Sequence, residues 1–238
     1  MRKMERLIVA LDVSSLKEAL KLVKTLSKYV KIFKVGKELF TSAGPEVIKM
    51  VHAHKCQVFL DLKFHDIPNT VGAACEAAAR MRVFMMNVHA LGGKQMLFQA
   101  VQSLHKLAEK NKKIKRPLLL GVTVLTSMKD QDLAEVGIYK KVAEEVRDLA
   151  LLSKACGLDG VVASGQEIEI IRKALGPDFI IVTPGVRPLW AAHGDQKRII
   201  TPKEAIKKGA SFIVVGRPIT QDKDPRNAAK KILEEING

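Results

Sequence analysis

The chain has 238 residues, of which 47% are hydrophobic and 27% charged, enough to bury a substantial core. No apolar run approaches the roughly 20 residues of a membrane helix, and no signal peptide is visible, so we expect a cytoplasmic protein without a membrane partner. The net charge of +15 raises the hypothesis of nucleic-acid binding, but the basic residues are spread over many segments, the densest at 110–116, without interleaved aromatics. A solvated basic surface that attracts a phosphorylated metabolite is the favoured interpretation, with no nucleic-acid partner.

Short apolar strands alternate with helical patterns from one end of the chain to the other. The first strand is followed by a capping box at Ser15 and by apolar residues at helical spacing. Two further capping boxes, at Ser164 and Thr201, predict helix starts. Strands are predicted at 7–12, 32–35, 58–63, 85–89, 118–125, 160–163, 179–183 and 212–215, and helices at 16–26, 45–52, 70–80, 96–107, 139–156, 164–175, from 202 and from 225.

Eight strand–helix units predict an α/β fold of the (β/α)8 barrel type, a TIM barrel, with residues 1–238 as a single catalytic domain. A doubly wound open sheet is the alternative, but it usually has fewer units, and no glycine-rich dinucleotide loop follows the first strand. The long polar connection at 185–200 lacks any periodic pattern, which is typical of a lid.

Charged residues stand at the predicted strand ends, where barrels of this kind build their active sites. Asp61 and Lys63 are separated by one residue, so strand alternation predicts that their side chains point the same way. Alone, this pair could be a weak surface salt bridge. The other residues at strand ends make a charged site the better hypothesis: Asp12, Lys34, Asp66, His89, Thr126, Ser164, Arg187, Gly216 and Arg217.

The segment after the last strand, with Gly216 and Arg217, fits the phosphate site that barrels often form there, although a turn with a surface arginine would look the same. The three cysteines and six histidines show no metal-ligand spacing, so neither a metal nor a cofactor is expected. For His65 and His89, near the same end, packing is the favoured role. Proton transfer and electrostatics are then the available chemistry.

The string D-x-K-x-x-D-I-P-N-T at residues 61–70 is highly specific, and weaker motifs accompany it in order at 10–12, 33–36, 124–127, 157–162, 182–187, 194–196 and 215–218. With these motifs the chain closely resembles the orotidine 5′-monophosphate decarboxylase family of the bacterial type, across essentially its whole length. The resemblance implies a cofactor-free decarboxylase that makes uridine monophosphate from orotidine monophosphate, the last step of pyrimidine synthesis, and works as a homodimer with shared active sites.

The resemblance also implies a role for each matching residue. Lys63 would protonate C6, Asp61 would lie beside the departing carboxylate, and Asp12 and Lys34 would hold the ribose hydroxyls. Asp66 and Thr70 would reach into the site of the partner subunit. Thr126 would contact the pyrimidine, and the phosphate would be held by Arg187, Gln196, Gly216 and Arg217 beneath the 185–200 lid.

Two alternatives stay open at this point. The sugar-phosphate decarboxylases of the same superfamily share the D-x-K-x-x-D core but use Mg2+, which Lys34 would repel. A basic nucleic-acid-binding protein, from a different class, would account for the charge of +15 but not for the acids at the strand ends.

Overall fold

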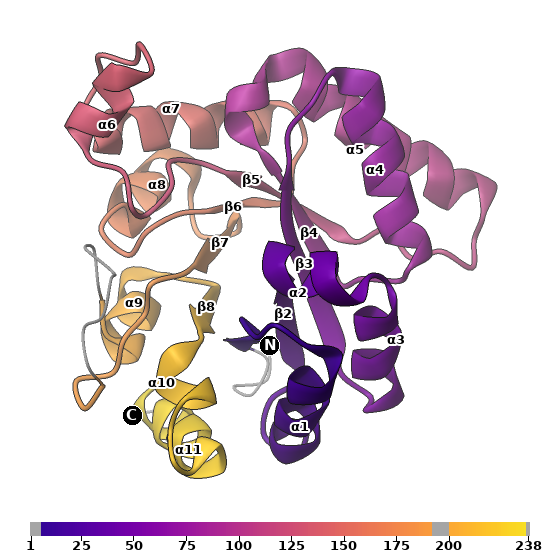
Figure 1. Ribbon diagram of the computed structural model, residues 1–238. Coiled ribbons are helices and arrows are strands. Elements are labelled where there is room, and N and C mark those ends of the chain that lie inside the picture. Colours follow the sequence, from indigo (N-terminus) through magenta and orange to yellow (C-terminus); the bar gives the residue numbers. More distant parts are fainter. Residues whose placement is uncertain (1–5, 192–199, 237–238) are drawn as a thin grey trace.

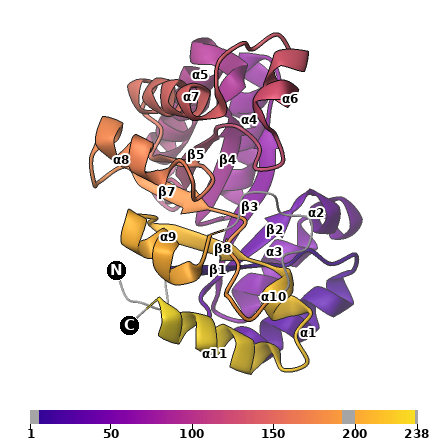
Figure 2. The same ribbon diagram turned by 90° about the vertical axis from the view of Figure 1, so that its left-hand side faces the viewer.

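The computed structural model describes residues 6–191 and 200–236. Its strands form a closed parallel barrel in the order β1 to β8, and β8 pairs with β1. The helices surround this barrel (Figures 1 and 2). The predicted (β/α)8 fold is therefore confirmed. The strands are β1 (Leu7–Ala10), β2 (Ile32–Gly36), β3 (Gln57–Phe64), β4 (Met85–His89), β5 (Leu118–Val122), β6 (Gly160–Val162), β7 (Ile180–Thr183) and β8 (Phe212–Val215).

The helices connect successive strands and pack on their outer faces. The first and last helices, α1 and α11, lie side by side (Figure 2). The helices are α1 (Leu16–Leu26), α2 (Lys37–Ala43), α3 (Glu46–Ala53), α4 (Pro68–Arg80), α5 (Gly93–Lys110), α6 (Asp130–Glu135), α7 (Val142–Ala155), α8 (Ile168–Leu175), α9 (Pro202–Lys208), α10 (Arg217–Thr220) and α11 (Pro225–Glu235), with a 3-10 turn, η2, at Ala90–Gly92. No helix of the described part is long and apolar enough to cross a membrane.

Strand alternation divides the buried residues into two cores. One lies between the strands and the helices. The other fills the inside of the barrel with alternate strand residues such as Ile8, Ile32 and Phe59. Phe84 and Phe212 meet edge to face at the amino end of the barrel, with ring centroids 6.2 Å apart. The interior is thus packed below the mouth, so a ligand that enters the mouth can meet only the residues above this core.

Several local predictions were wrong. Ser164 does not cap a helix: its hydroxyl accepts from the backbone of Gln166, and α8 begins only at Ile168. Strand β5 ends at Val122 rather than at 125, and β1 ends at Ala10. Three short helices, α2, α6 and α10, were not predicted, because none of them has the capping signal and apolar repeat that longer helices carry.

Candidate active site

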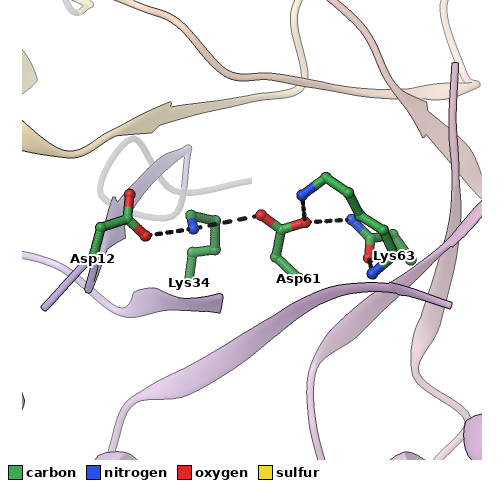
Figure 3. A network of polar contacts seen from close by, with 5 residues as sticks. Asp12, Lys34, Asp61 and Lys63 are labelled. Atoms are coloured by element: carbon green, nitrogen blue, oxygen red, sulfur yellow. Dashed lines mark hydrogen bonds and ion pairs between the residues drawn. The ribbon is translucent and has the colours of Figure 1, made fainter. Parts of the chain in front are cut away.

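Four charged side chains, Asp12, Lys34, Asp61 and Lys63, lie in a row across the mouth of the barrel (Figure 3). The Nζ of Lys34 is 2.8 Å from Oδ1 of Asp12 and 3.4 Å from Oδ2 of Asp61. The Nζ of Lys63 is 2.6 Å from Oδ1 of Asp61. We call these four residues the charged row. Acid and ammonium alternate along it, so each inner group has an oppositely charged neighbour on both sides.

The positions of Lys34 and Asp61 in the charged row follow from the alternation of side chains between the two faces of a strand. Ile32 and Lys34 share the inner face of β2, as Phe59 and Asp61 share that of β3, so each charged group is the inward position directly above the apolar core. Gly36 then leaves room for the ammonium of Lys34, since a Cβ at residue 36 would approach Nζ to 3.0 Å. For Lys34 and Asp61, the apolar layer below and the charged layer above both follow from alternation.

The central pair of the row is desolvated, with 12% of the Lys34 side chain and 13% of the Asp61 side chain exposed. Burial by itself would lower the pKa of Lys34, but the charges of Asp61 and Asp12 outweigh it, and the pKa is raised. Burial would likewise raise the pKa of Asp61, but the charges of Lys34 and Lys63 and hydrogen bonds outweigh it, and the pKa is lowered. Both groups are therefore ionised at neutral pH.

Asp61 and Lys63 meet through a bulge in β3 and not through simple alternation. Leu60 pairs with Met86 and Phe64 with Val88, so three residues of β3 lie opposite one residue of β4, Asn87. Within this bulge Lys63 adopts a left-handed conformation, with φ of 52°. For a non-glycine residue that conformation is unfavourable by about 1–2 kcal/mol. The predicted side-by-side arrangement is present, but its backbone was not foreseen.

Asn87 holds the bulge together and is the site residue that the sequence analysis missed. Its side chain is fully buried; Nδ2 donates to Oδ1 of Asp61 at 2.7 Å and Oδ1 accepts from the backbone N–H of Lys63 at 2.8 Å. The sequence does contain a signal for such a role: Asn87 is a polar residue between the apolar Met85, Met86 and Val88, and it shares a strand face with His89. A buried amide in a strand needs partners.

A cavity of about 440 Å³ opens on one side of the charged row. Asp12, Lys34 and Asp61 form one wall, and the segments after β7 and β8 form the other, with Arg187, Gly216 and Arg217. Burial and then the charge of Arg217 lower the pKa of Arg187, so two guanidinium groups stand close together at this wall. An anion between them would relieve their repulsion. We call this the larger cavity.

A smaller cavity of about 140 Å³ adjoins it and shares Lys34, Asp61, Pro184 and Val214 with it. Lys63 and Thr126 are among its walls, and most of the rest is apolar, from Phe59 at the floor to side chains of β5 and β6. The charged row therefore separates a cationic space from a mainly apolar one.

Asp66 and Thr70 are not brought to either cavity. Both are exposed, Asp66 in the turn before α4 and Thr70 on its first turn. Oδ1 of Asp66 accepts from the backbone of Ile67 at 2.6 Å. Gln196 lies outside the described residues, as does part of the predicted 185–200 lid, whose ends are joined by a bridge between Val186 and Ile200.

His65 and His89 stack on one another beside the mouth, with ring centroids 5.4 Å apart. Burial lowers the pKa of His89 to about 4, assisted by the charges of His65, Lys63 and Lys37. Within the described part of the chain, no three His, Cys, Asp or Glu side chains gather closely enough to hold a metal ion.

The fold and the site define a (β/α)8-barrel enzyme whose reactive groups are carboxylates and ammonium groups at the strand ends. The family model described as Orotidine 5'-phosphate decarboxylase / HUMPS family matches residues 5–232. The chain belongs to this family.

Relatives and solved structures agree with that assignment. The chain is 54% identical to an orotidine 5′-phosphate decarboxylase of Trichlorobacter lovleyi, with 97% of this chain and 95% of the relative covered. It is 52% identical to one of Syntrophotalea carbinolica, covering 98% and 95%. Among solved structures, orotidine 5′-phosphate decarboxylase from Lactobacillus acidophilus superposes with a TM-score of 0.85 at 40% identity, covering 98% of this chain and all of the other.

Proposed function

We propose that this chain decarboxylates orotidine 5′-monophosphate to uridine 5′-monophosphate, with Lys63 as the proton donor to C6. The relatives that carry this name match the chain from end to end. The observation that carries the mechanism is the charged row, because it sets an ionised carboxylate and an ammonium group 2.6 Å apart at one point of the mouth.

The substrate fits the two cavities in one orientation. Its phosphate belongs in the larger cavity beside Arg187 and Arg217, and its pyrimidine in the smaller one beside Thr126. The ribose then crosses the row at Asp12 and Lys34, whose polar groups suit hydroxyls. This orientation directs C6 and its carboxylate toward Asp61 and Lys63.

The reaction breaks the bond between C6 and the carboxylate, leaves its electron pair on C6 and releases CO2. The ammonium of Lys63 stabilises the developing negative charge and gives its proton to C6. The resulting neutral amine regains a proton from solvent before the next cycle. No ring position can absorb the charge of this carbanion, so a fixed positive group at C6 is the main requirement.

Asp61 contributes by repelling the substrate carboxylate. Two unit charges about 4 Å apart repel by about 4 kcal/mol at an effective dielectric constant near 20. Enzymes typically lower barriers by roughly 8–23 kcal/mol. Repulsion by Asp61 is therefore only part of the effect, and stabilisation by Lys63 with remote binding of the phosphate must supply the rest.

We also propose a cytoplasmic homodimer in which the whole chain acts as one catalytic domain. Asp66 lies outside its own mouth, and the surface around it exposes apolar side chains, with Ile67 67% and Leu91 40% exposed. An interface over this rim would bury them and carry Asp66 and Thr70 toward the site of a partner.

The decisive assay follows the ultraviolet absorbance of orotidine monophosphate, with and without excess EDTA. We expect turnover in both conditions, because Lys34 stands between Asp12 and Asp61 at the position that a bridging cation would need. Failure to consume orotidine monophosphate would refute the proposal. Activity lost in EDTA and restored by Mg2+ would instead favour the sugar-phosphate decarboxylases.

A further inference from the structure

The densest basic segment of the chain, residues 110–116, takes no part in the proposed reaction. It connects the end of α5 to the start of β5 and therefore lies at the amino end of the barrel, opposite the mouth. A cavity of about 380 Å³ opens beside it, within the size range of small-molecule sites. Its walls come from this segment and from the starts of β3 and β4: Gln57, Arg82, Val83, Phe84, Lys113, Lys115, Arg116, Pro117 and Leu118.

The positive charge of this amino-end cavity is largely uncompensated. Arg116 is neutralised by Asp159, which accepts from both of its terminal nitrogens and also from the backbone of Leu119. Arg82, Lys113 and Lys115 are exposed and form no ion pair with any other residue between 6 and 191 or 200 and 236. Three cationic side chains from two separate loops thus border one opening.

Helix dipoles do not account for the charges of the two lysines. Cations are favoured at the last turn of a helix, and the effect falls off within that turn. Lys113 and Lys115 lie three and five residues beyond Lys110, the last residue of α5. The side chain of Asn111 accepts from the backbone of Lys113, which gives this loop a defined path.

An apolar surface lies beside the cations. Phe84 is partly exposed in the cavity, and its ring is held edge to face by Phe212 from the barrel interior. Pro117 and Leu118 continue this surface. Arg82, two residues before Phe84, has a left-handed φ of 59° because it lies just beyond the end of α4, where its N–H donates to the carbonyl of Ala79. A flat ring and a chain of negative charges could therefore be held together.

We infer that the amino-end cavity binds a nucleoside triphosphate, with its phosphates on Arg82, Lys113 and Lys115 and its base against Phe84 and Leu118. A single-stranded nucleic acid fits less well, because such ligands need a track of stacking aromatics and this cavity offers one phenylalanine. The site is separate from the mouth, so it can be filled while the barrel carries substrate.

The test is isothermal titration calorimetry of the full-length protein with ATP, without divalent metal, at low and physiological ionic strength. The double variant Lys113→Ala/Lys115→Ala should bind ATP more weakly, with a Kd raised at least about tenfold, since two charge-assisted contacts are lost. Lys110→Ala/Lys112→Ala removes the same charge from the same segment without touching the cavity, and should change the Kd less than about twofold. Turnover should be unaltered in both variants, which verifies folding, and thermal melting should shift by no more than a few degrees, because Lys110 lies in the last turn of α5.

Five results would overturn the inference. Two concern ATP and the double variants: no measurable binding of ATP up to millimolar concentration, or equal weakening in the two double variants. Loss of binding in Arg217→Ala would place ATP in the mouth. A single-stranded oligonucleotide that binds more tightly than ATP through the same lysines would replace the nucleotide by a nucleic acid. The fifth result concerns tripolyphosphate. Inorganic tripolyphosphate should bind through the same lysines but less tightly than ATP. Equal affinity would remove the role of Phe84 and with it the assignment to a nucleotide.

Discussion

Asn87 and Asp61 are joined by a hydrogen bond of 2.7 Å that ends on Oδ1, the same carboxylate oxygen that accepts from the ammonium of Lys63. The carboxylate is therefore held from β4 as well as from its own strand. Its rotation would break the contact with Lys63 at the same time. Asn87 thus fixes the direction of a charge in a reaction that depends on directed charge.

Replacing Asn87 by Ala should lower kcat by about a hundredfold or more and change KM much less, because the reacting charges move while the phosphate contacts stay. It should also cost about 2–3 kcal/mol of unfolding free energy, since the N–H of Lys63 loses its buried partner. Steady-state kinetics and urea unfolding measure both. Asn111→Ala is the matched control: it also removes a side-chain bond to a backbone N–H, but far from the mouth, and kcat should be unchanged.

Lys63→Ala and Lys63→Gly should both abolish turnover, because neither carries an amine. They should differ in stability, since glycine adopts a φ of 52° without strain and alanine does not. We expect the glycine variant to be more stable by up to about 1 kcal/mol in thermal melts. Residual activity in either variant would contradict the role of Lys63 as proton donor. Unfolding of both variants would show that Lys63 has a structural role instead.

Arg217→Ala should raise KM for orotidine monophosphate and lower kcat, because the phosphate loses a guanidinium partner at the wall of the larger cavity. The dephosphorylated nucleoside, assayed with the same variant, should be turned over as by the unaltered protein. The ratio of kcat/KM between the two substrates measures the effect. An equal loss for both substrates would contradict a phosphate role.

Homodimers of Lys63→Ala and of Asp66→Asn should each be nearly inactive. If Asp66 acts in the partner's site, mixing them by dissociation and reassociation creates heterodimers with one intact site and one doubly defective site. Random equal mixing should then restore roughly a quarter of all sites. If Asp66 serves its own chain, no site is restored. Native mass spectrometry verifies that heterodimers have formed before the assay is interpreted.

Acid should weaken the fold partly through His89. Its pKa is lowered to about 4 in the folded protein, against about 6.5 in an unfolded chain. Between these values the ring is protonated in the unfolded chain but neutral in the folded protein. The contribution of His89 to the unfolding free energy is therefore complete above pH 6.5 and is lost as the pH falls toward 4. Because the ring is only partly buried, we expect about 1–2 kcal/mol after discounting for solvent screening.

The variant His89→Gln has no such group, so its unfolding free energy should fall less steeply between pH 6.5 and 4.5 in urea titrations. Above pH 7 the difference between the two proteins should be constant. Parallel curves down to pH 4.5 would show that His89 does not titrate as its surroundings imply.

The barrel could be predicted because its sequence signals are local and repeated. Each strand is an apolar run such as that of β8, Phe212–Val215, and several helices have a cap and an apolar stripe, as α1 has with Ser15. The members of the charged row could be predicted for the same reason, since each lies within such a strand or just after it. Local patterns therefore sufficed wherever the structure is regular.

The remaining features depend on contacts between strands. Nothing within residues 57–64 indicates that Lys63 leaves the extended conformation, because the bulge exists only against Asn87 of the neighbouring strand. In the sequence Ser164 resembles a helix cap, but in the structure its hydroxyl accepts a hydrogen bond from the backbone N–H of Gln166 in a turn. The amino-end cavity likewise forms from loops that are about 30 residues apart in the chain.

The pairing of β1 with β8 places Leu7 opposite Ile213. During synthesis, the edge of β1 that pairs with β8 therefore has no partner until about 200 further residues have been made, which takes roughly 10–40 s at ribosomal speed. Arg217 is made later still, so a nascent chain can contain the entire charged row while one of the two arginines of the proposed phosphate site is still missing. Throughout that interval an unpaired strand edge is open to other chains. The nascent protein is thus open to edge-to-edge aggregation until β8 pairs with β1 and closes the barrel.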